Sequence, residues 1–275
     1  MMFSFQNPLI DLFFEPGDKP LIPLRFQHLN FHQNPHIFQF KEHFIFKDTH
    51  YFYDLTLNGY APKIKGIHKS DLIYFNSVPS QLSIGDGLYS SGYVYPQDFD
   101  TYQDLSPLTL AFPTADCVSV TLISLKNQSL MISHIHLGWK GYVAGFLDKT
   151  FDLHTSLGSE VFAIIHPGIF GKNYPCGKDV WIKLLELYQN KPPEFTSFLE
   201  ESDSLCRPQN FIYSKYYIDL QWLIFHDLLF LGAQQIRFMR YDTFDHPLLP
   251  SHRAKTTQRL YSHVVPLNFY PWSFP

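Results

Sequence analysis

Short hydrophobic runs of two kinds follow one another along the chain. In the first hundred residues the runs are brief, and those at 38–40 and 44–46 alternate with polar positions, which is typical of β-strands. Residues 71–75 form a further strand-like run. From residue 118 onward, strand-like runs take turns with stretches whose apolar positions recur at helical spacing. This order predicts an α+β fold, with a central mixed β-sheet flanked by helices in a single domain.

The clearest local feature is a pair of apolar runs around one polar turn. Residues 118–125 are apolar and mostly β-branched, residues 126–129 are polar, and residues 130–136 form the second run. The pattern predicts a β-hairpin whose far strand ends lie together. Cys117 and His136 stand at those ends. The hairpin would therefore make them neighbours in space.

A helix is predicted directly after the hairpin, from near Gly141 to about residue 155, and Gly138 lies in the turn before it. The first backbone N–H groups of a helix have no partner within the helix, and the helix dipole favours negative charge there. One segment would then offer a thiol, an imidazole and a phosphate cradle. The alternative interpretation is a packed cysteine and a hydrogen-bonded core histidine.

The rest of the chain continues the alternation. The predicted elements are a strand at 161–166, a helix from near Gly177, a short helix and loop at 194–210, a helix at 217–231 that ends at Gly232, and strands at 236–239 and 260–265. Cys176 would lie near a helix N-terminus, where thiols become more acidic, although simple packing is the preferred interpretation. The aromatic tail at 269–272 is expected to pack in the core or in a dimer.

Composition narrows the class of protein. Hydrophobic residues make up 45% of the 275 residues, so a sizeable core is expected. The net charge is −4 without a basic stripe, which argues against a nucleic-acid partner. Three scattered cysteines do not form a disulfide framework and favour a reducing, cytoplasmic setting. The N-terminus is a poor signal peptide and no stretch is long enough to span a bilayer, so we expect no membrane partner.

Two motifs in the central segment resemble the signature of a known family. They are Thr114-Ala115-Asp116-Cys117 and, after the hairpin, His136-Leu137-Gly138-Trp139-Lys140-Gly141. The family comprises proteins first called multicopper polyphenol oxidases, or laccase-like proteins, and later described as zinc-dependent purine nucleoside phosphorylases. The resemblance covers about residues 64–265 and implies that residues 1–275 form one such domain, with a divergent part at 1–60.

Further pieces of the family pattern occur before and after these two motifs, in the expected order along the chain. They are His68-Lys69, the turn at 85–88, the loop from Pro167 through Tyr174 to Gly177, Asp219-Leu220, Thr243, Ser251-x-Arg253, and Arg259. The chain departs from the family in three places. The N-terminal Arg-x-Gly-Gly element is not recognisable in residues 1–60, Gly66-Ile67 precedes His68 where Gln is expected, and Lys140 stands where Arg is usual.

The resemblance implies that His68, Cys117 and His136 bind one metal ion and contribute to catalysis. Two imidazoles and one thiolate suit zinc, with copper as the alternative, and three protein ligands leave a position for water or substrate. The implied reaction is phosphorolysis of adenosine, inosine or guanosine to the free base and ribose 1-phosphate, with adenosine deamination as a side activity. The implied partners are a purine nucleoside and phosphate, and the protein would be a monomer or a homodimer.

Phosphate requires cations, for which Lys140, Arg253 and Arg259 are the candidates. Asp116 has two interpretations that the sequence leaves open. It could orient a metal ligand or act as an acid or base, or its carboxylate could cap backbone amides in a turn.

Three other functions compete with the phosphorylase. A copper-dependent polyphenol oxidase would need many His-x-His ligand pairs, and only His134-Ile135-His136 has that form. A Cys-His hydrolase or amidase would use Cys117 as nucleophile and His136 as base, without a metal. A non-catalytic member of the family would bind metal without turnover.

Overall fold

The structure is a computed structural model, and it describes part of the chain. The described residues are 9–13, 39–46, 49–56, 64–65, 72–74, 83–84, 87–94, 110–126, 129–156, 160–189, 191, 216–266 and 269–271. The predicted helix and loop at 194–210, Cys206 and the candidate ligand His68 lie outside these residues.

A large mixed sheet forms the centre of the described part. Its strands, in spatial order, are β1 (Leu9–Phe13), β14 (Gln235–Met239), β11 (Glu160–Ile165), β9 (Val118–Lys126), β10 (Ser129–Leu137), β7 (Gly87–Val94) and β16 (Phe269–Pro271), with β5 (Leu72–Tyr74) paired to β7. The pairs β11–β14 and β5–β7 are parallel, and the other described pairs of this sheet are antiparallel. The predicted mixed sheet is therefore confirmed.

A second sheet packs beside the first. Within the described residues it consists of β2 (Gln39–Phe46), β3 (Thr49–Thr56), β15 (Leu260–Pro266) and β8 (Leu110–Thr114), in that order. Two short pairs complete the strands, β4 (Ile64–Lys65) with β6 (Ser83–Ile84) and β12 (Pro175–Cys176) with β13 (Tyr216–Tyr217).

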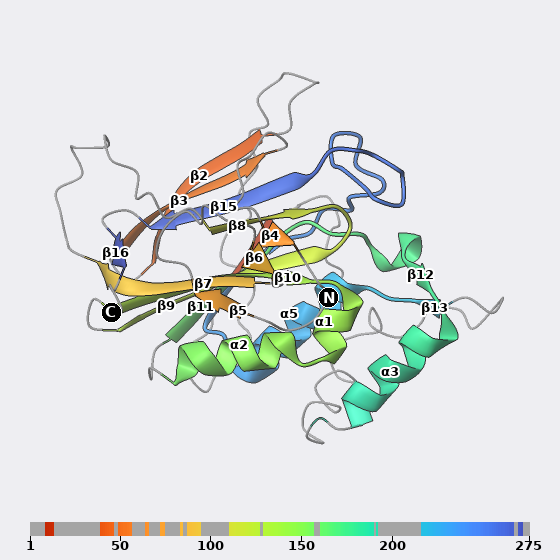
Figure 1. Ribbon diagram of the computed structural model, residues 1–275, viewed down its shortest axis with the longest axis horizontal. Coiled ribbons are helices and arrows are strands. Elements are labelled where there is room, and N and C mark those ends of the chain that lie inside the picture. Colours follow the sequence, from red (N-terminus) through yellow and green to blue (C-terminus); the bar gives the residue numbers. More distant parts are fainter. Residues whose placement is uncertain are drawn as a thin grey trace.

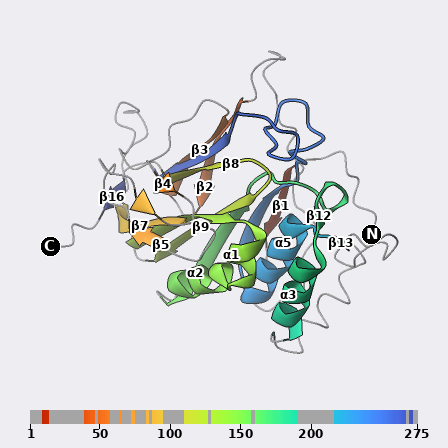
Figure 2. The same ribbon diagram turned by 45° about the vertical axis from the view of Figure 1, so that its right-hand side comes forward.

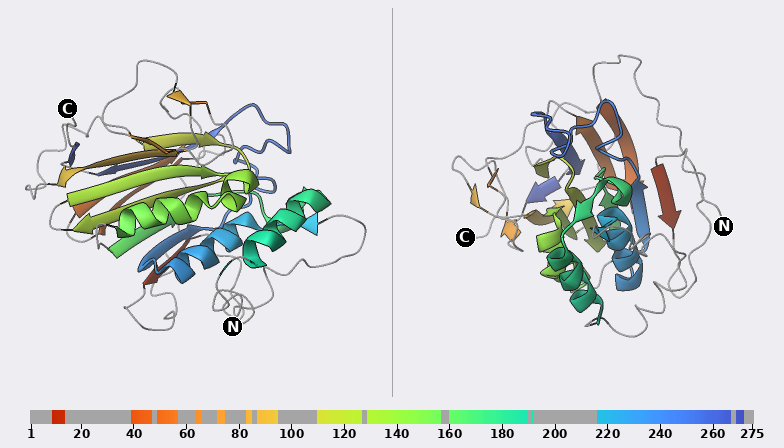
Figure 3. Two further views of the ribbon diagram at one scale, coloured as in Figure 1. Left: turned by 60° about the horizontal axis from the view of Figure 1, so that its bottom comes forward. Right: turned by 90° about the vertical axis from the view of Figure 1, so that its right-hand side faces the viewer.

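The layers are visible in Figure 1, where the second sheet lies above the large sheet and the helices lie below it. The helices are α1 (Trp139–Val143), α2 (Phe146–Thr155), α3 (Lys178–Gln189) and α5 (Leu220–Leu231). The turned view of Figure 2 and the end-on view of Figure 3 show the same order of second sheet, large sheet and helices. This arrangement confirms the predicted α+β class.

The predicted hairpin is confirmed as β9 and β10. Residues 118–125 of β9 and 130–137 of β10 are all buried, because the second sheet covers one face of the hairpin and the helices cover the other. Two-sided burial explains why both strands read as nearly continuous apolar runs. In the register of the pair, Leu137 lies opposite Val118 and His136 opposite Ser119. Cys117, which precedes Val118, is therefore placed beside His136 as predicted.

The predicted helix after the hairpin is wrong in its extent. It begins at Trp139 rather than near Gly141, and it is divided into α1 and α2. Gly145 has a left-handed backbone with φ of 70°, which no continuous right-handed helix accommodates. The apolar spacing continues across the break because Phe146 and Leu147 face the same core as Tyr142.

The helix expected at 217–231 is also shorter than predicted. Tyr216 and Tyr217 form β13 against β12, and the helix α5 begins at Leu220. The Asp219 carboxylate accepts a hydrogen bond from the Trp222 N–H and so provides the N-cap. Gly232 ends the helix in a left-handed conformation, as predicted.

Smaller differences concern strands. Residues 39–40 and 44–46 of the two predicted runs belong to one strand, β2, and Phe38 lies outside the described residues. The loop expected at 97–110 gives way to β8 at Leu110. The aromatic tail contributes β16, which pairs with β7. In the described part of the chain, no helix is both long and apolar enough to cross a membrane.

Buried polar side chains connect the layers. The Thr121 hydroxyl lies 2.8 Å from His134 Nδ1 and 2.9 Å from His166 Nε2, and the Ser262 hydroxyl of the second sheet lies 3.2 Å from His134 Nε2. On the helix side of the large sheet, His154 of α2 bonds the hydroxyls of Ser124 and Ser133, both at 2.9 Å. These contacts satisfy histidines that would otherwise be costly to bury.

Candidate active site

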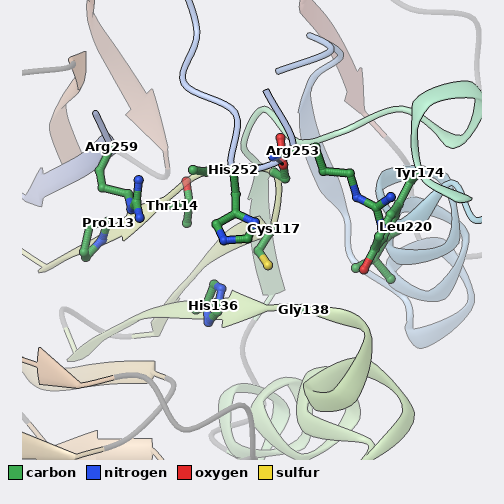
Figure 4. Close-up of a pocket in the computed structure, with 12 residues that line it drawn as sticks. Pro113, Thr114, Cys117, His136, Gly138, Tyr174, Leu220, His252, Arg253 and Arg259 are labelled. Carbon is green, nitrogen blue, oxygen red and sulfur yellow. Dashed lines mark hydrogen bonds between the residues drawn. The ribbon is translucent and has the colours of Figure 1, made fainter. Parts of the chain in front are cut away.

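A cavity of 380 Å³ opens where β8, β9 and β10 end. Its volume is within the range of small-molecule sites. The residues that line it are Pro113, Thr114, Ala115, Asp116, Cys117, His136, Gly138, Tyr174, Leu220, His252, Arg253 and Arg259. They come from the two central motifs, from the loop before α3, from the start of α5 and from the loop before β15, and Figure 4 shows ten of them labelled.

Cys117 and His136 lie at the centre of this cavity. Figure 4 shows the Cys117 sulfur and the His136 ring facing the same space from two neighbouring strand ends. The Cys117 side chain is half-buried and its thiol is free of any disulfide, and His136 is only 8% exposed. The pair predicted from the hairpin thus faces a space that a ligand can enter.

Asp116 holds the cavity wall together. Its backbone φ is +78°, a left-handed conformation that aspartate adopts more readily than most residues. One carboxylate oxygen accepts a hydrogen bond from the Thr243 hydroxyl at 2.8 Å, and the other accepts one from the Arg253 backbone N–H at 2.8 Å. Asp116 also accepts the Ile169 N–H at 3.0 Å through its carbonyl oxygen. The carboxylate therefore does cap a backbone amide, as in the second of its two interpretations, and its role as an acid, a base or an orienting group stays a prediction.

Gly168 lets the chain approach Asp116 closely. A Cβ atom at this position would lie 2.7 Å from Val118 Cγ2 and 3.2 Å from the Asp116 carbonyl oxygen. Since glycine has no side chain, the Pro167-Gly168 turn can pack directly against the Asp116-Cys117 turn.

Arg253 and Arg259 reach the cavity from the loop before β15. The Arg253 guanidinium donates to the Pro175 carbonyl at 2.9 Å and lies 5.0 Å from the centre of the Tyr174 ring. Arg259 Nη1 donates to the Gln258 carbonyl at 2.7 Å. Each guanidinium has further donors, so both can also meet an anion in the cavity.

Lys140 does not line the cavity. It is exposed on α1, and its ammonium lies 5.7 Å from the centre of the neighbouring Trp139 ring, over which Lys183 of α3 is also placed. Gly138, the N-cap of α1, does line the cavity, but α1 is only five residues long. The role of Lys140 as a phosphate ligand stays a prediction that the geometry does not favour.

The metal site stays a prediction as well. The described part of the chain contains no group of three or more His, Cys, Asp or Glu side chains placed to hold one ion. Two of the three predicted ligands, Cys117 and His136, line one cavity, and His68 lies outside the described residues.

Two residues of the cavity with polar side chains, His252 and Tyr174, were assigned no role from the sequence. His252 occupies the variable position of Ser251-x-Arg253, and its ring lies near Cys117 in Figure 4. Tyr174 stood within a matched loop, but it carried no assigned role. Both reach the cavity through contacts between segments far apart in the sequence. The matched motif positions were the only signal that pointed to them.

Cys176 is not an activated thiol. Burial, followed by the charge of Asp179, raises its pKa to about 11. The alternative interpretation of Cys176 as a more acidic thiol near a helix N-terminus is therefore wrong. The preferred packing interpretation agrees with the contact of Cys176 with the core.

Comparison with known proteins shows that other proteins share this fold. Three solved structures share the fold. They are a Neisseria meningitidis protein (18% identity, 75% of each chain, TM-score 0.55), YlmD from Geobacillus stearothermophilus (20% identity, 73% of this chain and 71% of that one, TM-score 0.54) and the hypothetical protein YfiH from Bacillus licheniformis (20% identity, 74% and 73%, TM-score 0.52).

The chain belongs to the family described as multi-copper polyphenol oxidoreductase laccase, whose sequence profile matches residues 67–265. This match confirms the resemblance. A curated relative from Deinococcus radiodurans, a purine nucleoside phosphorylase, is 35% identical over 74 residues. That alignment spans 26% of this chain and 28% of the relative.

Proposed function

We propose that this protein is a metal-dependent purine nucleoside phosphorylase that acts on a nucleoside and phosphate. The observation that carries the proposal is the shared cavity of Cys117, His136, Arg253 and Arg259. A thiol and an imidazole suited to a metal ion lie there with two cations suited to phosphate. The partial match to a named purine nucleoside phosphorylase supports the same reaction.

The residues present fit a metal ion. The thiol of Cys117 and the imidazole of His136 are ligands that zinc prefers, and both face the cavity rather than the core. His68 would be the third ligand. A bound zinc ion would supply a Lewis acid beside the reactants. Copper is the alternative metal, since the donor set also suits it.

The cationic residues would bind and orient phosphate. In the reaction a phosphate oxygen bonds to C1′ of the ribose while the bond from C1′ to the base breaks, and the base takes the bonding electrons. Arg259 would hold the dianion in line with that bond and offset its charge. Arg253, whose guanidinium lies over the Tyr174 ring and bonds to the Pro175 carbonyl, would add positive charge from its own side of the cavity. Asp116 would not transfer protons. It would fix the loop from which Arg253 reaches the cavity.

Adenosine deamination is proposed as a side activity of the same site, because it needs water activated next to a purine. The Cys-His hydrolase is the second candidate, and one observation favours it. Cys117 and His136 are neighbours in an accessible cavity, as a nucleophile and its base must be. It differs from the phosphorylase in needing neither metal nor phosphate.

Metal content and activity of Cys117→Ala test the proposal together. We expect about one zinc ion per chain, the count for a single three-ligand site. We also expect base release from inosine or adenosine that disappears with the metal in the variant. Cys176→Ala is the matched control, since Cys176 does not line the cavity. Metal-free protein whose activity survives chelation but is lost on thiol alkylation would replace the phosphorylase with the hydrolase. Bound metal without turnover would indicate a non-catalytic member of the family.

A further inference from the structure

The cavity is chemically different at its two ends. Figure 4 shows Arg259 at one end and Tyr174 with Leu220 at the other, with Cys117, His136 and His252 between them in this view. One end therefore offers the Arg259 guanidinium, and the other offers an aromatic ring and a leucine, with the Arg253 guanidinium against the ring. The two reactants of a phosphorylase differ in a matching way, because the planar base and the phosphate dianion lie on opposite sides of the ribose carbon that reacts.

Tyr174 is held in place by its own backbone. Its N–H donates to the Gly171 carbonyl at 3.0 Å, and its carbonyl accepts the Ile218 N–H at 3.2 Å. These bonds fix the backbone of Tyr174 to the segment that starts α5. Leu220, which is only 2% exposed, lies beside Tyr174 at the cavity.

Two carboxylates anchor the loop that leads to Tyr174. Asp242 accepts the Phe170 N–H at 3.2 Å and the Asn173 amide at 2.7 Å. Asp219 accepts the Gly171 N–H at 3.2 Å and is itself paired with Arg240. A loop fixed at so many points presents its ring in one orientation, which lowers the entropic cost of binding a flat ligand.

Arg253 completes this wall. Its guanidinium lies over one face of the Tyr174 ring and bonds to the next residue, Pro175. It therefore covers the ring from one side, and the ring also packs against the hydrophobic core and lines the cavity.

We propose that Tyr174 and Leu220 form the base-binding end of the cavity and determine its preference for a planar heterocycle, while Arg259 marks the phosphate end. This inference rests on the proposed function. Aromatic side chains bind bases by stacking, which every base permits, and a neutral phenol adds one directional hydrogen bond. Arg253 acts on the base end as a positioning residue, through the Tyr174 ring.

The test compares Michaelis constants for the two substrates in the full-length, metal-loaded protein. We expect Tyr174→Leu to raise the KM for inosine about 10-fold to 100-fold, the loss that corresponds to a stacked aromatic ring. The KM for phosphate should change by less than about 3-fold, within the usual scatter of independent sites. Arg259→Gln should show the reverse pattern. Tyr174→Phe keeps the ring and should weaken inosine less than Tyr174→Leu.

Phe244→Leu is the matched control, because it also removes an aromatic ring and Phe244 is exposed outside the cavity lining. Equal changes in both constants for Tyr174→Leu, or no change in the KM for inosine, would overturn the inference and leave the phosphorylase intact. If the wild type releases no base, the proposed function fails, and calorimetric binding of inosine decides the inference. Binding that Tyr174→Leu weakens supports the base end, and binding that it leaves unchanged overturns it.

Discussion

The carboxylate of Asp116 accepts the backbone N–H of Arg253 at 2.8 Å, across a separation of 137 residues in the chain. The contact joins the turn that carries Cys117 to the loop that carries His252 and Arg253. The Thr243 hydroxyl donates a hydrogen bond to the other carboxylate oxygen of Asp116. One buried side chain therefore sets the distance between the predicted metal ligands and the cationic side of the cavity.

Substitution of Asp116 separates its two interpretations. Asn tolerates the left-handed backbone, and its amide can accept from Arg253 and donate to the Thr243 hydroxyl, so Asp116→Asn should unfold at nearly the wild-type denaturant concentration. Asp116→Ala leaves two donors unmatched and strains the backbone, and should lose about 2–4 kcal/mol of unfolding free energy. Asp152→Ala, at an exposed position of α2, is the control. A stable Asp116→Asn variant with activity reduced about 100-fold or more would instead assign Asp116 an acid or base role.

Gly168→Ala should damage the site by packing alone. The added Cβ would stand 2.7 Å from Val118 Cγ2, and relief of that contact must shift the turn at Asp116 and Cys117. We expect a loss of about 1–3 kcal/mol of unfolding free energy, together with weaker metal binding. Gly232→Ala is the control, because its cost comes from a left-handed φ of 89° far from the cavity lining. Equal metal affinity in the two variants would show that the Gly168 turn does not position Cys117.

The buried histidines predict a loss of stability in mild acid. Burial lowers the pKa of His154 to about 3, whereas in the unfolded chain it titrates near 6.5. Between these values the unfolded state binds the extra proton, so the free energy of unfolding falls as pH falls, by up to about 1.4 kcal/mol per pH unit for this one side chain. His226, with a pKa lowered to about 4 by burial, acts in the same direction.

Urea unfolding of wild type and His154→Gln between pH 7 and pH 4 isolates this contribution. The variant should show a shallower dependence on pH, by about one proton. Asp227 acts in the opposite direction, because burial raises its pKa to about 6, but its contribution is common to both proteins and drops out of the comparison. Parallel pH profiles would contradict a neutral, buried His154.

Metal should protect one thiol selectively. If Cys117 is a ligand, alkylation of the zinc-loaded protein should leave it unmodified, and chelation should expose it together with loss of activity that added zinc restores. Cys176 is the internal reference, because its raised pKa of about 11 makes it slow to react in either state. Mass spectrometry of the modified peptides gives the result. Rapid alkylation of Cys117 in the loaded protein would exclude it as a ligand.

The sequence predicted the parts of the fold that local pattern determines. The β9–β10 hairpin was predictable because both strands are buried on both faces and a short polar turn joins them. The break at Gly145 was not, since the apolar spacing on its two sides serves one core and spacing carries no information about φ. The start of α5 was placed too early because Tyr216 and Tyr217 are committed to a strand pair with β12, a tertiary contact.

The candidate site was predicted to the extent that motifs carry it. Asp116, Cys117, His136, Arg253 and Arg259 do line one cavity. Lys140 follows the same motif in sequence, yet its position on α1 leaves it exposed outside the cavity lining. Tyr174 and His252 needed the structure, because bonds between distant segments, such as Ile218 N–H to the Tyr174 carbonyl, bring them to the cavity.

The most direct test of the proposed function is product analysis of the zinc-loaded protein incubated with inosine, with and without phosphate. We predict hypoxanthine and ribose 1-phosphate in equal amounts, only when phosphate is present, and neither product after Cys117→Ala. Free ribose in place of ribose 1-phosphate, or no hypoxanthine from protein that holds its metal, would contradict it.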